Sequence, residues 1–133
     1  MKREFDITGE NYDSFSYTSY GETYDDCSFD VARYPDNGTV AIDVTSSSQG
    51  SICRITVDLD YAGVAMKNPE DDMIAIKDYS ENEGIVDAMI RAGLIEEEPL
   101  YWIQSSFVNI PIMRLSKSFA KYIAERLKEF DNR

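Results

Sequence analysis

The stretch CSFDVARYPDNGTVAIDVTSSSQGSICRITVDL, which runs from Cys27 to Leu59, decides the fold of this chain. Apolar and polar residues alternate over 27–31, 40–44 and 53–59, as in antiparallel strands with one solvated face. Turn residues such as Pro, Asn, Gly and Ser fill the short gaps between these strands. The pattern therefore predicts a meander. The residues expected on its buried face are Phe29, Val31, Val40, Ile42, Val44, Ile55, Val57 and Leu59.

The opposite face of this meander is expected to be wet. The alternation places Asp30, Asp43 and Asp58 on the wet face, near Arg54 and Thr56. Opposite charges on neighbouring strands contribute only about 0.2 to 1 kcal/mol. These polar side chains are therefore expected to matter less for stability than the buried face.

Two further regions are predicted to form strands. An earlier strand is expected over 15–24, where Tyr17, Tyr20 and Tyr24 favour strand without fixing its register. Residues 100–115 are expected to form one or two strands. Because Pro111 cannot donate a backbone hydrogen bond, we place the second half of this region at a sheet edge or a bulge.

Two helices are predicted to cover the dry face of the sheet. Residues 80–83 read Ser-Glu-Asn-Glu, a capping box, and Gly93 stands where a left-handed residue ends a helix. The apolar stripe of this first helix consists of Ile85, Val86, Met89 and Ile90. A second helix is expected to begin near Ser116. Its stripe consists of Phe119, Tyr122, Ile123, Leu127 and Phe130. The sequence thus predicts one α+β domain over residues 1–133: an antiparallel meander sheet with one wet face and two helices on the other.

The charge composition restricts the possible functions. The 133 residues include 25 Asp and Glu against 13 Lys and Arg, with no histidine and a formal net charge of -12. Histidine is the side chain most often used for acid–base catalysis and the commonest metal ligand. No apolar stretch approaches the roughly 18 residues of a membrane helix, and none follows the basic pair near the N-terminus. We therefore expect a cytoplasmic protein that binds neither nucleic acid directly nor membrane.

One segment resembles a calcium-binding loop but lacks ligands. Asp58, Asp60 and Gly63 match the first, third and sixth positions of an EF-hand loop. However, Ala62 occupies the fifth position, and Pro69 stands where a bidentate Glu is required. The carboxylate runs elsewhere, at 70–72 and 96–98, are typical of solvated loops. No metal site is predicted.

The remaining patterns do not predict catalysis. Cys27 and Cys53 fall on the apolar face of their strands, and no histidine is present to act as a base, so both are expected to be inert core thiols. The seven glycines are too scattered to form a phosphate-binding loop. We therefore predict no catalytic residue and no cofactor. Paired carboxylates could still hydrolyse a glycoside, and a small carboxylate-dependent hydrolase remains an alternative.

The first 30 residues interleave carboxylates with tyrosines, which predicts a partner-binding surface. Tyrosine is enriched at interfaces because it combines a large apolar area with a polar tip. The predicted partner-binding residues are Tyr20, Glu22, Tyr24, Asp25 and Asp26. The alternative is that half of the tyrosines point into the core, as strand alternation would require.

Four short segments of the chain resemble a known family. They read NGTVAI at 37–42, ITVDL at 55–59, AGLI at 92–95 and SFVNIPI at 106–112. Across residues 27–115 the chain resembles domain of unknown function 4313, small acidic proteins of bacterial mobile elements such as conjugative elements and phages. Ser105-Ser106 departs from the Ser-Gly expected before the aromatic residue. The resemblance implies a small α+β domain in a mobile-element setting, and no activity.

These observations predict a non-catalytic acidic protein that binds a basic protein partner, as an interaction module of a mobile element. An alternative within binding is a DNA-mimicking inhibitor of a defence or regulatory protein, because a field of carboxylates can imitate a phosphate backbone. The oligomeric state does not follow from the sequence.

Overall fold

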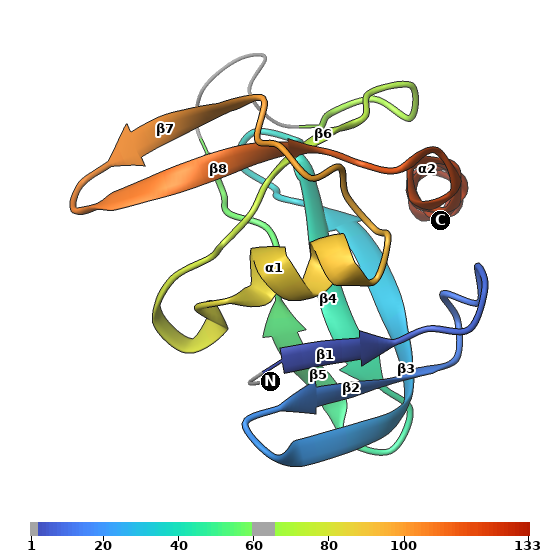
Figure 1. Cartoon of the computed structure of the whole chain (residues 1–133). Helices are drawn as coiled ribbons and strands as arrows, with labels where there is room; N and C mark the ends of the chain where they lie inside the picture. The colour runs from blue at the N-terminus through green and yellow to red at the C-terminus, as the bar shows by residue number, and fades with distance from the viewer. Residues whose placement is uncertain (1–2, 60–65) are drawn as a thin grey trace.

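The computed structural model describes residues 3–59 and 66–133 and shows an α+β fold. The larger sheet contains β1 (Arg3–Asp6), β2 (Phe15–Ser19), β3 (Glu22–Arg33), β4 (Val40–Ser46) and β5 (Gly50–Arg54), paired in that order. The smaller sheet has the order β6-β8-β7, with β6 (Met73–Ala75), β7 (Tyr101–Ser105) and β8 (Val108–Arg114). The helical segments are η1 (Ser80–Asn82), α1 (Ile85–Arg91) and α2 (Lys117–Asp131). Figure 1 shows α1 between β1 and the smaller sheet.

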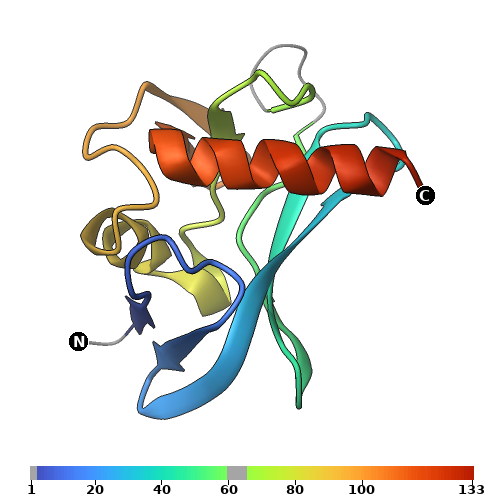
Figure 2. The same cartoon turned by 90° about the vertical axis from the view of Figure 1, so that its right-hand side faces the viewer.

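The predicted antiparallel meander is confirmed for residues 27–31 and 40–44. Its third strand was predicted over 53–59, but β5 covers Gly50–Arg54, and Val57 and Leu59 pack with residues of the smaller sheet. In the β3–β4 ladder Phe29 faces Val44 and Val31 faces Ile42, and all four side chains are buried. They join one core with residues of both helices, such as Met89 and Phe119. Both helices therefore cover the same face of the larger sheet, as predicted. Figure 2 shows α2 lying across the long, bent strand β3.

The alternation predicted over 53–59 is interrupted at Thr56. The Thr56 side chain was expected on the wet face but is 3% exposed, and its neighbour Ile55 is also buried. The Thr56 hydroxyl accepts a hydrogen bond from the Ile42 N–H at 3.1 Å and lies 3.1 Å from the Tyr34 hydroxyl. Thr56 also forms a β-bridge with Ile76, next to the smaller sheet. The Thr56 hydroxyl finds hydrogen-bond partners inside the protein, because the chain passes at this residue from the larger sheet toward the smaller sheet.

The prediction of a single strand over 15–24 is wrong, because this region forms a hairpin. β2 ends at Ser19, and β3 begins at Glu22. The two residues between them, Tyr20 and Gly21, have φ angles of 50° and 86°. Positive φ at both central residues is the geometry of a type I′ turn, whose twist suits a two-residue hairpin. The turn places Tyr17 in the core, where it is fully buried, while Tyr20 is 56% exposed.

The first predicted helix forms, but it begins differently. Its N-cap is Gly84, and no capping-box hydrogen bond is present, because the Ser-Glu-Asn-Glu segment lies in and just after η1. Instead, the Asp78 carboxylate accepts hydrogen bonds from the Gly84 and Val86 N–H groups at 3.0 and 3.1 Å. The predicted end is confirmed: Gly93 has φ 75°, and its N–H donates to the Ile90 carbonyl.

The structure confirms the predicted start of the second helix. Ser116 is its N-cap, and its hydroxyl accepts a hydrogen bond from the Phe119 N–H. The Phe119 ring packs against Phe29 of β3, with the ring centroids 4.9 Å apart. Tyr122 donates a hydrogen bond to Asp13 at 2.7 Å, and Tyr12 lies within hydrogen-bond distance of Ser118. These contacts hold the loop between β1 and β2 against α2.

Pro111 lies in the central strand of the smaller sheet, not at an edge or bulge as predicted. The β6–β8 ladder ends at the Ala75–Ile112 pair, and Pro111 is the residue next to Ile112 in β8. The Ile76 N–H then donates to the Pro111 carbonyl at 3.1 Å, and no N–H is available in return. Proline is tolerated in β8 because β6 is short and ends at this point.

Candidate functional site

The solvent-facing side of the larger sheet is covered by carboxylates and hydroxyls. Cross-strand pairs place Glu4 opposite Thr18, Asp6 opposite Ser16 and Ser28 opposite Thr45. Strand alternation turns all of these side chains away from the core. We call this surface the open face, and it consists of Glu4, Asp6, Ser16, Thr18, Thr23, Asp25, Asp26, Ser28, Asp30, Asp43, Thr45 and Arg54.

A β-bulge places two consecutive aspartates on the open face. The β2–β3 register shifts between Phe15 and Tyr17, so that Asp25 and Asp26 both lie opposite Ser16. Asp26 has φ 52°, a left-handed conformation that is uncommon outside glycine, asparagine and aspartate. In a regular strand one of these two side chains would face the core. The bulge instead leaves both exposed, and such bulges re-aim side chains at many functional sites.

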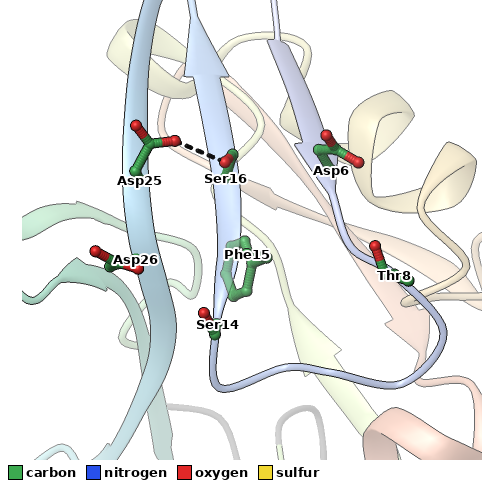
Figure 3. Close-up of a pocket in the computed structure, with 7 residues that line it drawn as sticks. All are labelled: Asp6, Thr8, Ser14, Phe15, Ser16, Asp25 and Asp26. Atoms are coloured by element: carbon green, nitrogen blue, oxygen red, sulfur yellow. Dashed lines mark hydrogen bonds between the residues drawn. The ribbon is translucent and has the colours of Figure 1, made fainter.

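The two aspartates line an acidic hollow of about 360 Å³. Figure 3 shows that Asp25 and Asp26 of β3 flank Ser16 on one side, while Asp6 of β1 lies on the other. The Ser16 hydroxyl donates a hydrogen bond to Asp25 at 2.8 Å. Thr8, Ser14, Ser16 and Phe15 complete the lining. The hollow thus presents three carboxylates and three hydroxyls to solvent.

The structure brings only part of the predicted partner-binding surface to this hollow. Asp25 and Asp26 line it. Tyr24 instead pairs with the buried Tyr17 and packs against the core, and its hydroxyl donates to Glu22 at 2.7 Å. Tyr20 lies in the hairpin turn, where the Arg3 guanidinium stacks over its ring at 4.9 Å.

Asp6 and the hydroxyls of Thr8, Ser14 and Ser16 line the hollow but were not predicted as site residues. The Arg-Glu-Phe-Asp of β1 does alternate, but its inward positions include a charged side chain, Arg3. Arg3 is only 4% exposed and donates to the Glu83 carbonyl, the Tyr17 hydroxyl and the Ser19 hydroxyl. A strand whose inner face carries an arginine does not show the apolar period of two.

The charge of the open face differs between its two ends. At one end Asp43 accepts two hydrogen bonds from Arg54, at 2.6 and 3.2 Å. A second small hollow beside Asp30 is lined by Arg126, Glu129 and Arg133 of the C-terminal region. The other end carries Glu4, Asp6, Asp25 and Asp26. None of the ion pairs within the described residues involves these four carboxylates. Carboxylates without an ion pair are therefore gathered around the acidic hollow.

The cysteines are free and poorly suited to nucleophilic chemistry. Cys27 is fully buried and Cys53 partly buried. Burial raises the pKa of Cys27 above its ordinary value, and it raises the pKa of Cys53 to about 11. Both side chains therefore stay protonated near neutral pH, and the thiol is much less nucleophilic than the thiolate.

Several carboxylates are held in the ionised form by hydrogen bonds. Hydrogen bonds from Tyr122, Lys77 and Arg33 lower the pKa values of Asp13, Glu81 and Asp131 respectively. A glycosidase needs a carboxyl group with a raised pKa to protonate the leaving group. These three carboxylates are therefore unsuited to act as general acids.

The predicted carboxylate runs have local structural contacts. Asp71 accepts hydrogen bonds from the Lys67 and Asn68 N–H groups, and Asp72 pairs with Arg114 at 2.7 Å. Glu96 lies 3.9 Å from Arg114. Among the described residues, no group of Cys, Asp and Glu side chains is arranged to hold a metal ion. Residues 60–63 of the calcium-like pattern lie outside the described residues.

Comparison with known proteins finds no match: no family model, no curated protein and no solved structure is similar to this chain. The resemblance to domain of unknown function 4313 therefore stays a prediction. Neither helix within residues 3–59 and 66–133 has the length and apolar character to cross a bilayer.

Proposed function

We propose that this chain is a non-catalytic interaction module that binds a basic protein through the acidic end of the open face. The observation that carries this proposal is the bulge that exposes Asp25 and Asp26 together, beside Asp6 on β1. Unpaired carboxylates on neighbouring strands raise the local negative potential, which attracts a cationic surface and speeds association. The hydroxyls between them can donate and accept hydrogen bonds once the partner has docked.

The local backbone supports a functional interpretation of this bulge. The left-handed conformation of Asp26 costs on the order of 1 kcal/mol relative to an ordinary strand conformation. The Asp25 carbonyl accepts from the Ser46 hydroxyl and the Asp26 carbonyl from the Ser47 N–H, both at 3.1 Å, which fixes the bulge. The fold therefore maintains an arrangement that does not favour its own stability.

The DNA-mimicking inhibitor is a second candidate, and the make-up of the open face favours it. The twelve side chains that define this face are charged or carry a hydroxyl, and the facing pair Ala32 and Ala41 adds only two methyl groups, whereas a protein–protein interface usually has an apolar centre. A partner surface built to contact phosphates would be polar and cationic enough to bind such a face without apolar contacts. The partner of this candidate would be a basic nucleic-acid-binding protein.

Affinity capture with three matched baits tests the proposal. The baits are the unmodified chain, the variant Asp25→Asn with Asp26→Asn, and a control, Asp36→Asn with Glu70→Gln. Both variants change the formal net charge from -12 to -10, and all four substituted residues are exposed. Basic proteins from the source organism that bind the unmodified chain and the control, but not the first variant, would support the proposal. Retention by all three baits would refute it.

Competition with double-stranded DNA separates the two candidates. If the captured partner is released by a short duplex of random sequence, the open face occupies a DNA-binding groove. If the duplex leaves the complex intact, the DNA-mimicking candidate is wrong and the partner contacts the open face by another surface.

A further inference from the structure

β7 itself lacks the features that usually block strand pairing, whereas Pro99 lies two residues before the strand. β7 has the sequence Tyr-Trp-Ile-Gln-Ser, with no charged residue, no proline and no register shift against β8. Natural edge strands commonly carry lysine, proline or a bulge to prevent pairing with another chain. Among the described residues, β8 is the only strand paired with β7, which forms the outer edge of the sheet in Figure 1. This edge is distinct from the open face.

Pro111 reveals which backbone groups of β7 point outward. The Pro111 carbonyl accepts from Ile76, on the β6 side of β8. Its cross-strand partner on β7 is Trp102, and in an antiparallel ladder such a pair shares no hydrogen bonds. The N–H and C=O of Trp102 therefore point away from β8, and so do those of Gln104, two residues along the strand.

Exposed aromatic side chains surround these outward groups. Trp102 is 57% exposed, Tyr101 is 38% exposed, and Phe107 in the β7–β8 turn is fully exposed. Trp102 itself carries two of the outward backbone groups, so its exposed ring lies directly beside them. Tryptophan and tyrosine are among the residues that contribute most to binding energy at interfaces.

The charge near this edge indicates the kind of segment that fits it. Glu96, Glu97 and Glu98 are exposed, and they precede β7 at the Arg114 end of β8, where the Glu96 N–H donates to the Arg114 carbonyl. A cationic side chain would be attracted to this run. A second copy of the chain is disfavoured, because each copy has a formal net charge of -12 and β7 itself carries no cation.

We propose that β7 binds an extended segment of another protein as an added strand. Such a segment would hydrogen-bond to the outward backbone groups of Trp102 and Gln104 and place apolar side chains against Trp102. A lysine or arginine at one end would lie next to the three glutamates. Main-chain bonds supply affinity in this mode of recognition, and alternate side chains supply specificity.

The substitution Gln104→Pro, with Gln104→Ala as its control, isolates the backbone contact. Proline removes an N–H that points away from β8, so the β7–β8 ladder keeps its hydrogen bonds, whereas alanine keeps this N–H. The probe is a displayed library of random eight-residue peptides selected against the full chain. We expect selected peptides to be rich in lysine or arginine and in β-branched or aromatic residues. Gln104→Pro should weaken their binding at least about tenfold and Gln104→Ala less than about threefold.

Three results would overturn the proposal: selected peptides that bind both variants equally, selected peptides without cations, or a dimer that dissociates on Gln104→Pro. The last result, measured by sedimentation, would assign the edge to a second copy. Circular dichroism of both variants checks that the fold is retained. If Gln104→Pro unfolds, Trp102→Ala serves in its place and is expected to weaken binding by a similar factor, while an unchanged affinity would overturn the proposal.

Discussion

Asp30 and Asp43 face each other directly in the β3–β4 ladder, and Arg54 faces Asp43 from the other side. Facing carboxylates repel each other, and both the pairing of Asp43 with Arg54 and the Arg126 and Arg133 side chains near Asp30 reduce this repulsion only in part. We expect Asp30→Asn to raise the free energy of unfolding by about 0.2 to 1 kcal/mol at low salt. Urea denaturation at low salt and in 1 M salt would measure this gain, which should shrink at high salt because of screening. A loss of stability at low salt would contradict the repulsion.

The polar and apolar faces of the sheet should differ in their contributions to stability. Arg54→Ala removes an exposed ion pair and a contact with the Tyr34 ring, so we expect a loss of less than about 1 kcal/mol. Ile42→Ala leaves a cavity in the fully buried core and should cost about 2 to 5 kcal/mol. Val57 is only partly buried, so Val57→Ala should cost less than Ile42→Ala. Chemical denaturation that ranked Arg54→Ala above Ile42→Ala would contradict the assignment of faces.

The start of α1 should depend on Asp78 and not on the capping-box sequence. Asp78→Ala removes the acceptor for two N–H groups and should lower the free energy of unfolding by about 1 kcal/mol. Glu83 makes no side-chain cap, so Glu83→Ala should change the stability by less than about 0.5 kcal/mol. Urea denaturation of both variants measures the two values. Equal losses would show that Glu83 also caps the helix.

The Cys53 thiol should make stability fall at alkaline pH. Burial raises its pKa from an ordinary 9.0 to about 11, so between these values the unfolded chain loses a proton that the folded chain keeps. This contribution is present below pH 9 and is lost as the pH rises to 11. We expect the unmodified chain to lose about 2 to 3 kcal/mol more than Cys53→Ala between pH 9 and pH 11. Parallel slopes for the two proteins would contradict the raised pKa.

The sequence predicted the elements whose signals are local and periodic. The alternation of Val40, Ile42 and Val44 predicted β4. The Ser116 cap and the apolar stripe that includes Phe119 predicted α2. Both patterns depend on residues close together in the chain. Contacts between distant residues could not be read in this way. Asp78 caps α1 from outside the helix, and Thr56 is buried because it bonds to Ile42 and Tyr34.

The candidate site was only partly predictable for a similar reason. The carboxylates Asp25 and Asp26 were visible as a charged pair in the sequence. Their joint exposure depends on a bulge, and strand alternation alone would have turned one of them inward. Gly21 offered a signal for the hairpin, since glycine readily adopts positive φ, but Tyr20 beside it did not. Asp6 entered the site only because the meander brings β1 beside β2.

The central claim is tested most directly by the association rate constant of a captured partner, measured in stopped flow at several salt concentrations. For the unmodified chain we expect this rate to fall steeply as salt rises, since the Debye length shrinks from about 10 Å at 0.1 M to about 3 Å at 1 M. Asp25→Asn with Asp26→Asn should slow association at low salt, while Asp36→Asn with Glu70→Gln, with the same charge change, should not. An association rate that ignores salt and is equal for both variants would contradict the claim that the acidic end of the open face binds a basic partner.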